Sequence, residues 1–135
     1  MRHAACLFLV VFCFASLAEG TYEYGTPAEL NGLTTYFLDT GTDVEMRNRI
    51  AAEVARETTA LTIADSSDHA RMQVRVMGND ASEQGASFLL YVTGQEGHAR
   101  LIHRFEYTHS KLPRLRPSAR FARDFTKLWR EAQSE

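Results

Sequence analysis

Strict alternation of apolar and polar residues marks the middle of the chain, and this period of two is typical of a β-strand with one exposed face. It covers residues 70–76 (ARMQVRV), and residues 99–106 (ARLIHRFE) alternate in a similar way with less regularity. Between them, residues 88–92 (FLLYV) are apolar in both alternating sets, so we expect this strand at the centre of a sheet. Two shorter β-rich runs, 33–39 (LTTYFLD) and 61–63 (LTI), predict two further strands.

Two other segments carry apolar residues at helical spacing. The first follows a turn at Thr40-Gly41 and extends to about Glu57, and we expect Thr42 to begin it in a capping box with Glu45. The second follows residues 111–117 (KLPRLRP), where proline ends any strand because it lacks an amide donor. The stripes expected to be buried are Met46, Ile50 and Val54 in the first helix and Phe121, Phe125, Leu128 and Trp129 in the second.

The predicted order is β-α-β-β-β-β-α, with residues 21–31 as a leader or edge segment. The first helix would cross over between the first two strands, and the later strands would form an antiparallel meander. We therefore expect an α+β fold, a two-layer sandwich of a mixed sheet of about five strands with both helices on one face.

The amino-terminal residues 1–20 have the features of a secretory signal peptide. Arg2 precedes an apolar run from Ala4 to Ala15, and small residues at Ser16 and Ala18 suit a signal peptidase. The alternative is an uncleaved anchor, but the run is shorter than the ~20 apolar residues that span a bilayer. We expect cleavage after Ala18 or Gly20, a secreted or periplasmic location, and one domain over residues 21–135 without a transmembrane segment.

Cysteine usage restricts the chemistry of the mature chain. Cys6 and Cys13 both lie within the predicted signal peptide. Residues 21–135 therefore have no disulfide, no thiolate nucleophile and no cysteine ligand for a metal.

No motif predicts catalysis, a cofactor or a bound metal. The run Asp65-Ser66-Ser67-Asp68-His69 contains the residue types of a hydrolase triad, but adjacency in sequence is not triad geometry, and a turn explains it. His98 and His103 are five residues apart, which places them on opposite faces of a strand. Gly41 lies between a strand and a helix without either glycine-rich phosphate-binding motif. We expect no catalytic residue, no metal and no cofactor.

A binding surface is the stronger hypothesis. If the sheet is covered on one side only, the predicted alternation places guanidinium groups around a leucine and tyrosine patch on the open side. Arginine and aromatic residues are favoured at the centres of interfaces. The alternative is an ordinary solvated sheet face. The candidate binding residues are Arg71, Gln73, Arg75, Leu89, Tyr91, Arg100, Ile102 and Arg104, with Glu106 beside them.

Charge is distributed unevenly along the chain. Residues 19–97 contain 13 acidic and 5 basic residues, whereas residues 98–135 contain 4 acidic and 9 basic ones. This asymmetry indicates either an anionic partner or two halves that attract each other within the fold. A second candidate surface, suited to anionic lipid or cell-wall polymer, consists of Lys111, Arg114, Arg116, Arg120, Arg123, Lys127 and Arg130 around the last helix.

The run PAELNGLTTYFLDTGTD (27–43), its following helix and ADSSDHARMQVRV (64–76) resemble small exported bacterial α/β domains. More distantly, the strand–helix–strand opening is similar to the amino-terminal module of the Tol-Pal propeller protein. The resemblance covers about half of the chain and implies a bacterial envelope setting with a binding or scaffolding role.

The sequence thus predicts an exported, non-enzymatic binding or scaffolding domain of the bacterial cell envelope, with an unknown protein or envelope component as partner and no nucleic acid. Two alternatives stay open. One is a small hydrolase or metal-dependent enzyme using His69, His98, His103 or His109 with nearby carboxylates, and the other is a basic surface-associated protein.

Overall fold

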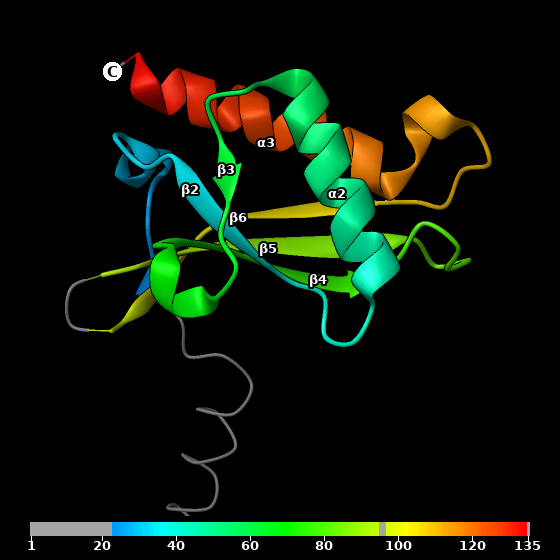
Figure 1. The fold of residues 1–135 in the computed structure, drawn as a ribbon, viewed down its shortest axis with the longest axis horizontal. Helices are drawn as coiled ribbons and strands as arrows, with labels where there is room; N and C mark the ends of the chain where they lie inside the picture. Colours follow the sequence, from blue (N-terminus) through cyan, green and yellow to red (C-terminus); the bar gives the residue numbers. More distant parts are fainter. Residues whose placement is uncertain (1–22, 95–96, 135) are drawn as a thin grey trace, which may run out of the picture.

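The computed structural model describes residues 23–94 and 97–134 (Figure 1). The predicted signal peptide and the tip of the predicted 94–97 hairpin lie outside the described residues. The strands are β1 (Glu23–Tyr24), β2 (Thr35–Asp39), β3 (Thr62–Ile63), β4 (Met72–Gly78), β5 (Ala86–Thr93) and β6 (Ala99–Tyr107). The helices are α2 (Val44–Glu57) and α3 (Pro117–Gln133), with short 3-10 helices η1 (Pro27–Leu30), η2 (Ser67–His69) and η3 (Pro113–Leu115).

The described strands form one mixed sheet in the order β1-β6-β5-β4-β2-β3. Parallel pairing joins β2 to β3 and to β4, whereas β4, β5 and β6 form an antiparallel meander. The α+β sandwich is confirmed, and so is the central place of β5. The sheet has six strands rather than five because β1, within the predicted leader segment, pairs in parallel with β6.

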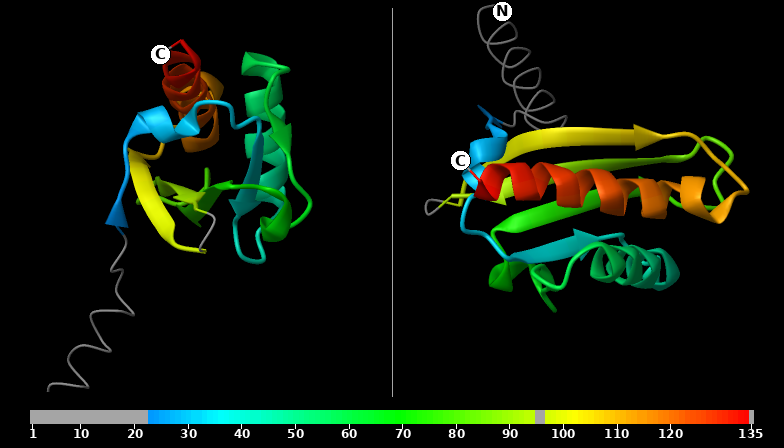
Figure 2. Two further views of the ribbon diagram at one scale, coloured as in Figure 1. Left: turned by 90° about the vertical axis from the view of Figure 1, so that its left-hand side faces the viewer. Right: turned by 90° about the horizontal axis from the view of Figure 1, so that it is seen from above.

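Both helices lie on the same side of the sheet (Figures 1 and 2). The predicted apolar stripes face the sheet: Met46, Ile50 and Val54 of α2 are at most 2% exposed. On α3, Phe121 and Phe125 are fully buried. The ring of Phe121 stacks on Phe88 of β5, with centroids 4.3 Å apart, and so fixes α3 against the central strand.

The predicted start of α2 is wrong by one residue. Asp43, not Thr42, is the N-cap, and its carboxylate accepts a hydrogen bond of 2.9 Å from the amide of Met46. Aspartate is at least as good a cap as threonine because its carboxylate also opposes the positive end of the helix dipole. Glu45, the predicted capping-box partner, instead forms an ion pair with Arg49 one turn further on.

A β-bulge interrupts β6 and changes which of its side chains face the helices. Leu90 of β5 pairs with His103, but the next residue, Tyr91, pairs with Leu101, so Ile102 is the extra residue. The extra residue of a bulge shifts the alternation of side chains by one position, so residues before the bulge face the side of the sheet opposite to the one that simple alternation predicts. Ile102 is therefore 7% exposed and belongs to the core under the helices.

Candidate functional site

The open face of the sheet, the side opposite α2 and α3, carries two regular rows of side chains across four strands. In one row Asp39, Arg75, Leu89 and Arg104 are neighbours in register. The adjacent row consists of Phe37, Gln73, Tyr91 and Leu101. Five predicted binding residues, Gln73, Arg75, Leu89, Tyr91 and Arg104, therefore do lie together on this face.

Two predicted open-face residues are placed on the other side by the bulge. Ile102 packs in the core. Arg100 lies opposite Val92, a buried residue of the helix-covered face, and its guanidinium forms an ion pair of 3.1 Å with Glu29 of η1. Leu101 takes their place beside Tyr91 on the open face. Arg71 lies just before β4, with its Nε donating a hydrogen bond to the carbonyl of Thr93.

The charges of the open face are largely balanced within it. Arg75 lies 4.0 Å from the carboxylate of Asp39, and Arg104 lies 3.7 Å from that of Glu106. The apolar centre is little exposed, because Leu89 and Tyr91 each retain 7% exposure between their longer neighbours. This face therefore offers a partner modest apolar area and little net charge.

The histidines do not converge within the described part of the chain. Nδ1 of His69 contacts both Asp65, at 2.7 Å, and Ser66, at 3.2 Å, so acid and hydroxyl meet the same ring nitrogen. A triad needs them on opposite nitrogens. His103 packs its ring 4.5 Å from Phe105, and Nδ1 of His109 donates to the carbonyl of Asp80. Among the described residues, no three His, Cys, Asp or Glu side chains gather where they could hold a metal ion.

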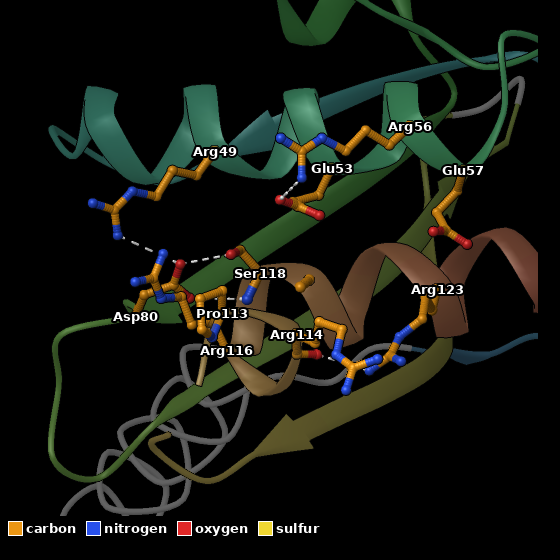
Figure 3. Close-up of a pocket in the computed structure, with 11 residues that line it drawn as sticks. Arg49, Glu53, Arg56, Glu57, Asp80, Pro113, Arg114, Arg116, Ser118 and Arg123 are labelled. Atoms are coloured by element: carbon orange, nitrogen blue, oxygen red, sulfur yellow. Dashed lines mark hydrogen bonds and ion pairs between the residues drawn. The ribbon is translucent and has the colours of Figure 1, made fainter. Parts of the chain in front are cut away.

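A depression lies on the helical layer, between α2 and the start of α3 (Figure 3). It has a volume of about 460 Å³, within the range of small-ligand pockets. We call it the arginine groove, because five arginines and three carboxylates line it: Arg49, Arg56, Arg114, Arg116 and Arg123, with Glu53, Glu57 and Asp80.

Two prolines shape one wall of this groove. Pro113 begins η3 and Pro117 begins α3, and the residues before them, Leu112 and Arg116, have extended backbone. Proline disfavours helical geometry in the preceding residue, so the chain forms the short 3-10 turn η3 and then a separate helix, α3, instead of one continuous helix. This irregular backbone, rather than a regular helix, presents Arg114 and Arg116 to the groove.

Asp80, from the loop between β4 and β5, lies at the inner end of the groove and caps α3. Its side chain is 3% exposed and accepts hydrogen bonds from the amide (2.9 Å) and the hydroxyl (2.6 Å) of Ser118. Arg49 approaches the same carboxylate at 3.6 Å. The helix terminus is thus already occupied by a protein carboxylate, and any anion affinity of the groove must come from its guanidinium groups.

Three of these guanidinium groups form no ion pair within the described part of the chain. Arg49 pairs with Glu45 and Arg56 with Glu53. Arg114, Arg116 and Arg123 form no ion pair with any carboxylate in residues 23–94 or 97–134. Arg123 instead donates to the carbonyl oxygen of Arg114 at 3.0 Å, which brings these two side chains to the same end of the groove (Figure 3).

The nearest acidic residue on α3 is engaged elsewhere. Asp124 accepts a hydrogen bond of 2.5 Å from the hydroxyl of Tyr107 on β6. Burial, followed by this hydrogen bond, raises the pKa of Tyr107 far above its ordinary value of 10.0, so the phenol stays protonated and keeps donating. Arg120 lies over the same ring, 4.9 Å from its centre. Asp124 thus points toward Tyr107 and forms no ion pair with Arg123.

The two oppositely charged halves of the sequence do not neutralise each other through ion pairs at this site. Among the described residues, Arg100–Glu29 joins the acidic and basic halves, whereas Arg49–Glu45 and Arg56–Glu53 lie within the acidic half. The basic residues predicted around the last helix are divided by the fold: Arg114, Arg116 and Arg123 line the groove, and Arg130 donates to the carbonyl of Glu57.

Sequence reasoning missed the contribution of α2 to this site. Arg49 and Arg56 are not among the residues predicted to bind, and only the packing of α2 beside α3 brings them next to the basic segment 113–123. No helix in the described part of the chain is long and apolar enough to cross a membrane. Comparison of the chain with protein-family models, curated proteins and solved structures finds no match.

Proposed function

We propose that this chain is an exported, non-enzymatic binding domain of the bacterial cell envelope, and that it binds an anionic ligand in the arginine groove. The observation that carries the proposal is the set Arg114, Arg116 and Arg123, which line one groove and form no ion pair with any carboxylate of the described residues. Like charges held together are unfavourable unless solvent or a counter-charge compensates them.

Phosphate-type oxyanions suit this arrangement. A guanidinium group presents donors in a fixed fork that matches phosphate, and a phosphate has three strong acceptor oxygens that can engage several arginines at once. A carboxylate has two. Asp80 and Glu53 already engage other groups of the groove, whereas Glu57, the third carboxylate of its lining, forms no ion pair among the described residues. We expect the ligand to contact the end where Arg123 meets the backbone of Arg114, where it must lie closer to these two guanidinium groups than to Glu57 (Figure 3).

Calorimetric titration with inorganic pyrophosphate tests this site. We expect Arg114→Gln and Arg123→Gln each to weaken binding by about tenfold, the effect of losing roughly 1.4 kcal/mol of charge-assisted hydrogen bonding. Arg75→Gln is the matched control, since it removes the same charge from the open sheet face. Equal losses in all three variants, or no binding by the unaltered protein, would refute the proposed site.

The proposed compartment rests on the apolar start of the sequence and has its own test. The protein should appear in the periplasmic or secreted fraction, with an intact mass that lacks residues 1–18 or 1–20. A product that retains Met1 to Ala18 would overturn the assignment.

The open sheet face is a second candidate surface, for a protein partner. It is favoured by one observation, the apolar row that Phe37, Tyr91 and Leu101 form around Gln73, with Leu89 in the adjacent row. The partner should present apolar side chains to this row, with carboxylates near Arg75 and Arg104. Arg75→Glu with Arg104→Glu should then abolish partner capture while leaving pyrophosphate binding in the groove intact, and an unchanged capture would exclude this face.

A further inference from the structure

The segment from Lys111 to Arg116, which we call the 111–116 loop, combines two properties that have separate causes. Its three cations, Lys111, Arg114 and Arg116, continue the positive charge of the arginine groove. Its two leucines, Leu112 and Leu115, are 62% and 42% exposed. Large apolar side chains this exposed are uncommon in the described structure, and two of them fall within four residues of each other.

The local backbone keeps the two leucines out of regular secondary structure. Proline at 113 and at 117 breaks the chain into η3 and the start of α3, so this segment cannot pair with the sheet or continue a helix. Neither leucine lines the groove, although their neighbours Pro113, Arg114 and Arg116 do. The loop thus presents apolar tips outside a cationic groove.

We infer that the 111–116 loop attaches the protein to an anionic lipid surface, with Leu112 and Leu115 entering the interface while the groove arginines bind headgroup phosphates. This inference rests on the proposed anion site and names its ligand. Apolar side chains interleaved with cations favour the interface of an anionic bilayer, because burial of the leucines and attraction to the headgroups act together. A second basic depression of about 330 Å³ shares Arg49, Asp80 and Arg116 with the groove and adds His109 and Lys111, which widens the cationic area beside the loop.

Co-sedimentation of the purified, exported protein with phosphatidylcholine vesicles, with and without phosphatidylglycerol, tests this inference. We expect binding to the phosphatidylglycerol vesicles and at least tenfold weaker binding to phosphatidylcholine alone. Leu112→Ser and Leu115→Ser should each weaken binding by roughly fivefold, because each removes an inserted apolar side chain. Tyr24→Ser is the matched control: Tyr24 is 80% exposed, on β1 at the opposite end of the sheet (Figure 1).

The outcomes separate this inference from the proposed function. Pyrophosphate binding without vesicle binding would overturn the lipid assignment and leave the anion site in place. Vesicle binding that is equal in the leucine variants and in Tyr24→Ser would also overturn it, since electrostatic attraction alone would then explain attachment. Failure to bind either pyrophosphate or vesicles would remove the proposed function as well. Circular dichroism of each variant confirms that the fold is retained.

Discussion

Asp80 provides the most informative single substitution, because one buried carboxylate holds the β4–β5 loop, the start of α3 and the groove together. Its oxygens accept from the amide and the hydroxyl of Ser118, and Arg49 lies 3.6 Å away. The residue at the N-cap position of α3, Arg116, makes no side-chain capping hydrogen bond. The helix therefore has no local cap, and the carboxylate of Asp80, 38 positions before Ser118 in the sequence, takes that role.

The expected cost follows from these contacts. Asp80→Ala leaves the buried amide and hydroxyl of Ser118 without their acceptor, and each such loss costs about 1–3 kcal/mol. The negative charge at the helix start is worth up to about 2 kcal/mol more in a partly buried site. Allowing for partial compensation by water, we expect a loss of about 3 kcal/mol for Asp80→Ala. About half of that is expected for Asp80→Asn, whose amide oxygen still accepts one hydrogen bond.

Equilibrium unfolding in urea, followed by circular dichroism and by the fluorescence of Trp129, measures this difference. With a slope of about 2 kcal/mol per molar urea, the midpoint should fall by roughly 1.5 M in Asp80→Ala. Glu83→Ala, an exposed acidic position in the same loop, is the control and should shift the midpoint little. If the free energies of unfolding of Asp80→Ala and Glu83→Ala differ by less than about 0.5 kcal/mol, Asp80 does not cap α3.

Four further substitutions, one of them a control, test the fold. Gly85→Ala should prevent folding, because at φ +83° the added Cβ would clash with a backbone carbonyl of β6, whereas Gly97→Ala, with similar φ but open space, should cost only about 1 kcal/mol in urea unfolding. Phe121→Ala should cost about 3–5 kcal/mol, since the ring is fully buried between other aromatic rings; a loss below 1 kcal/mol in the same assay would contradict the packing. The hydrogen bond to Asp65, followed by its charge, raises the pKa of His69 above 6.5, so this pair stabilises the fold below that pH and its contribution fades as the pH rises through the raised pKa. NMR titration should show the His69 pKa returning toward 6.5 in Asp65→Asn, and an unchanged value would exclude the pair in solution.

The correct sequence predictions are those that depend on local pattern. The burial of Met46, Ile50 and Val54, the central place of β5 and the start of α3 near Pro117 all follow from periodicity and proline chemistry. A side chain that repeats with the period of its own element must face the same way as its neighbours, whatever lies across from it. These features can therefore be predicted from the local sequence without knowledge of the tertiary contacts.

Apart from the N-cap of α2, the incorrect predictions involve a partner distant in sequence. Alternation placed Arg100 and Ile102 on the open face because a single strand gives no sign of a bulge, which is defined only by two residues opposing one on the neighbouring strand. The strand β1 lies at the edge of the sheet, within residues predicted as a leader or edge segment, but it was not counted as a strand: Glu23–Tyr24 is too short to predict one by pattern, and only pairing with β6 defines it.

The sequence by itself determined the layered α+β architecture, the buried faces of both helices and the basic character of the carboxy-terminal third. The tertiary structure alone decided where that charge gathers. Packing α2 beside the start of α3 joins Arg49 and Arg56 to Arg114, Arg116 and Arg123, and the Asp80 carboxylate fixes the end of the groove. Periodicity indicates which face of an element is buried. A site between two elements depends on how they pack against each other, and a local sequence pattern carries no information about that packing.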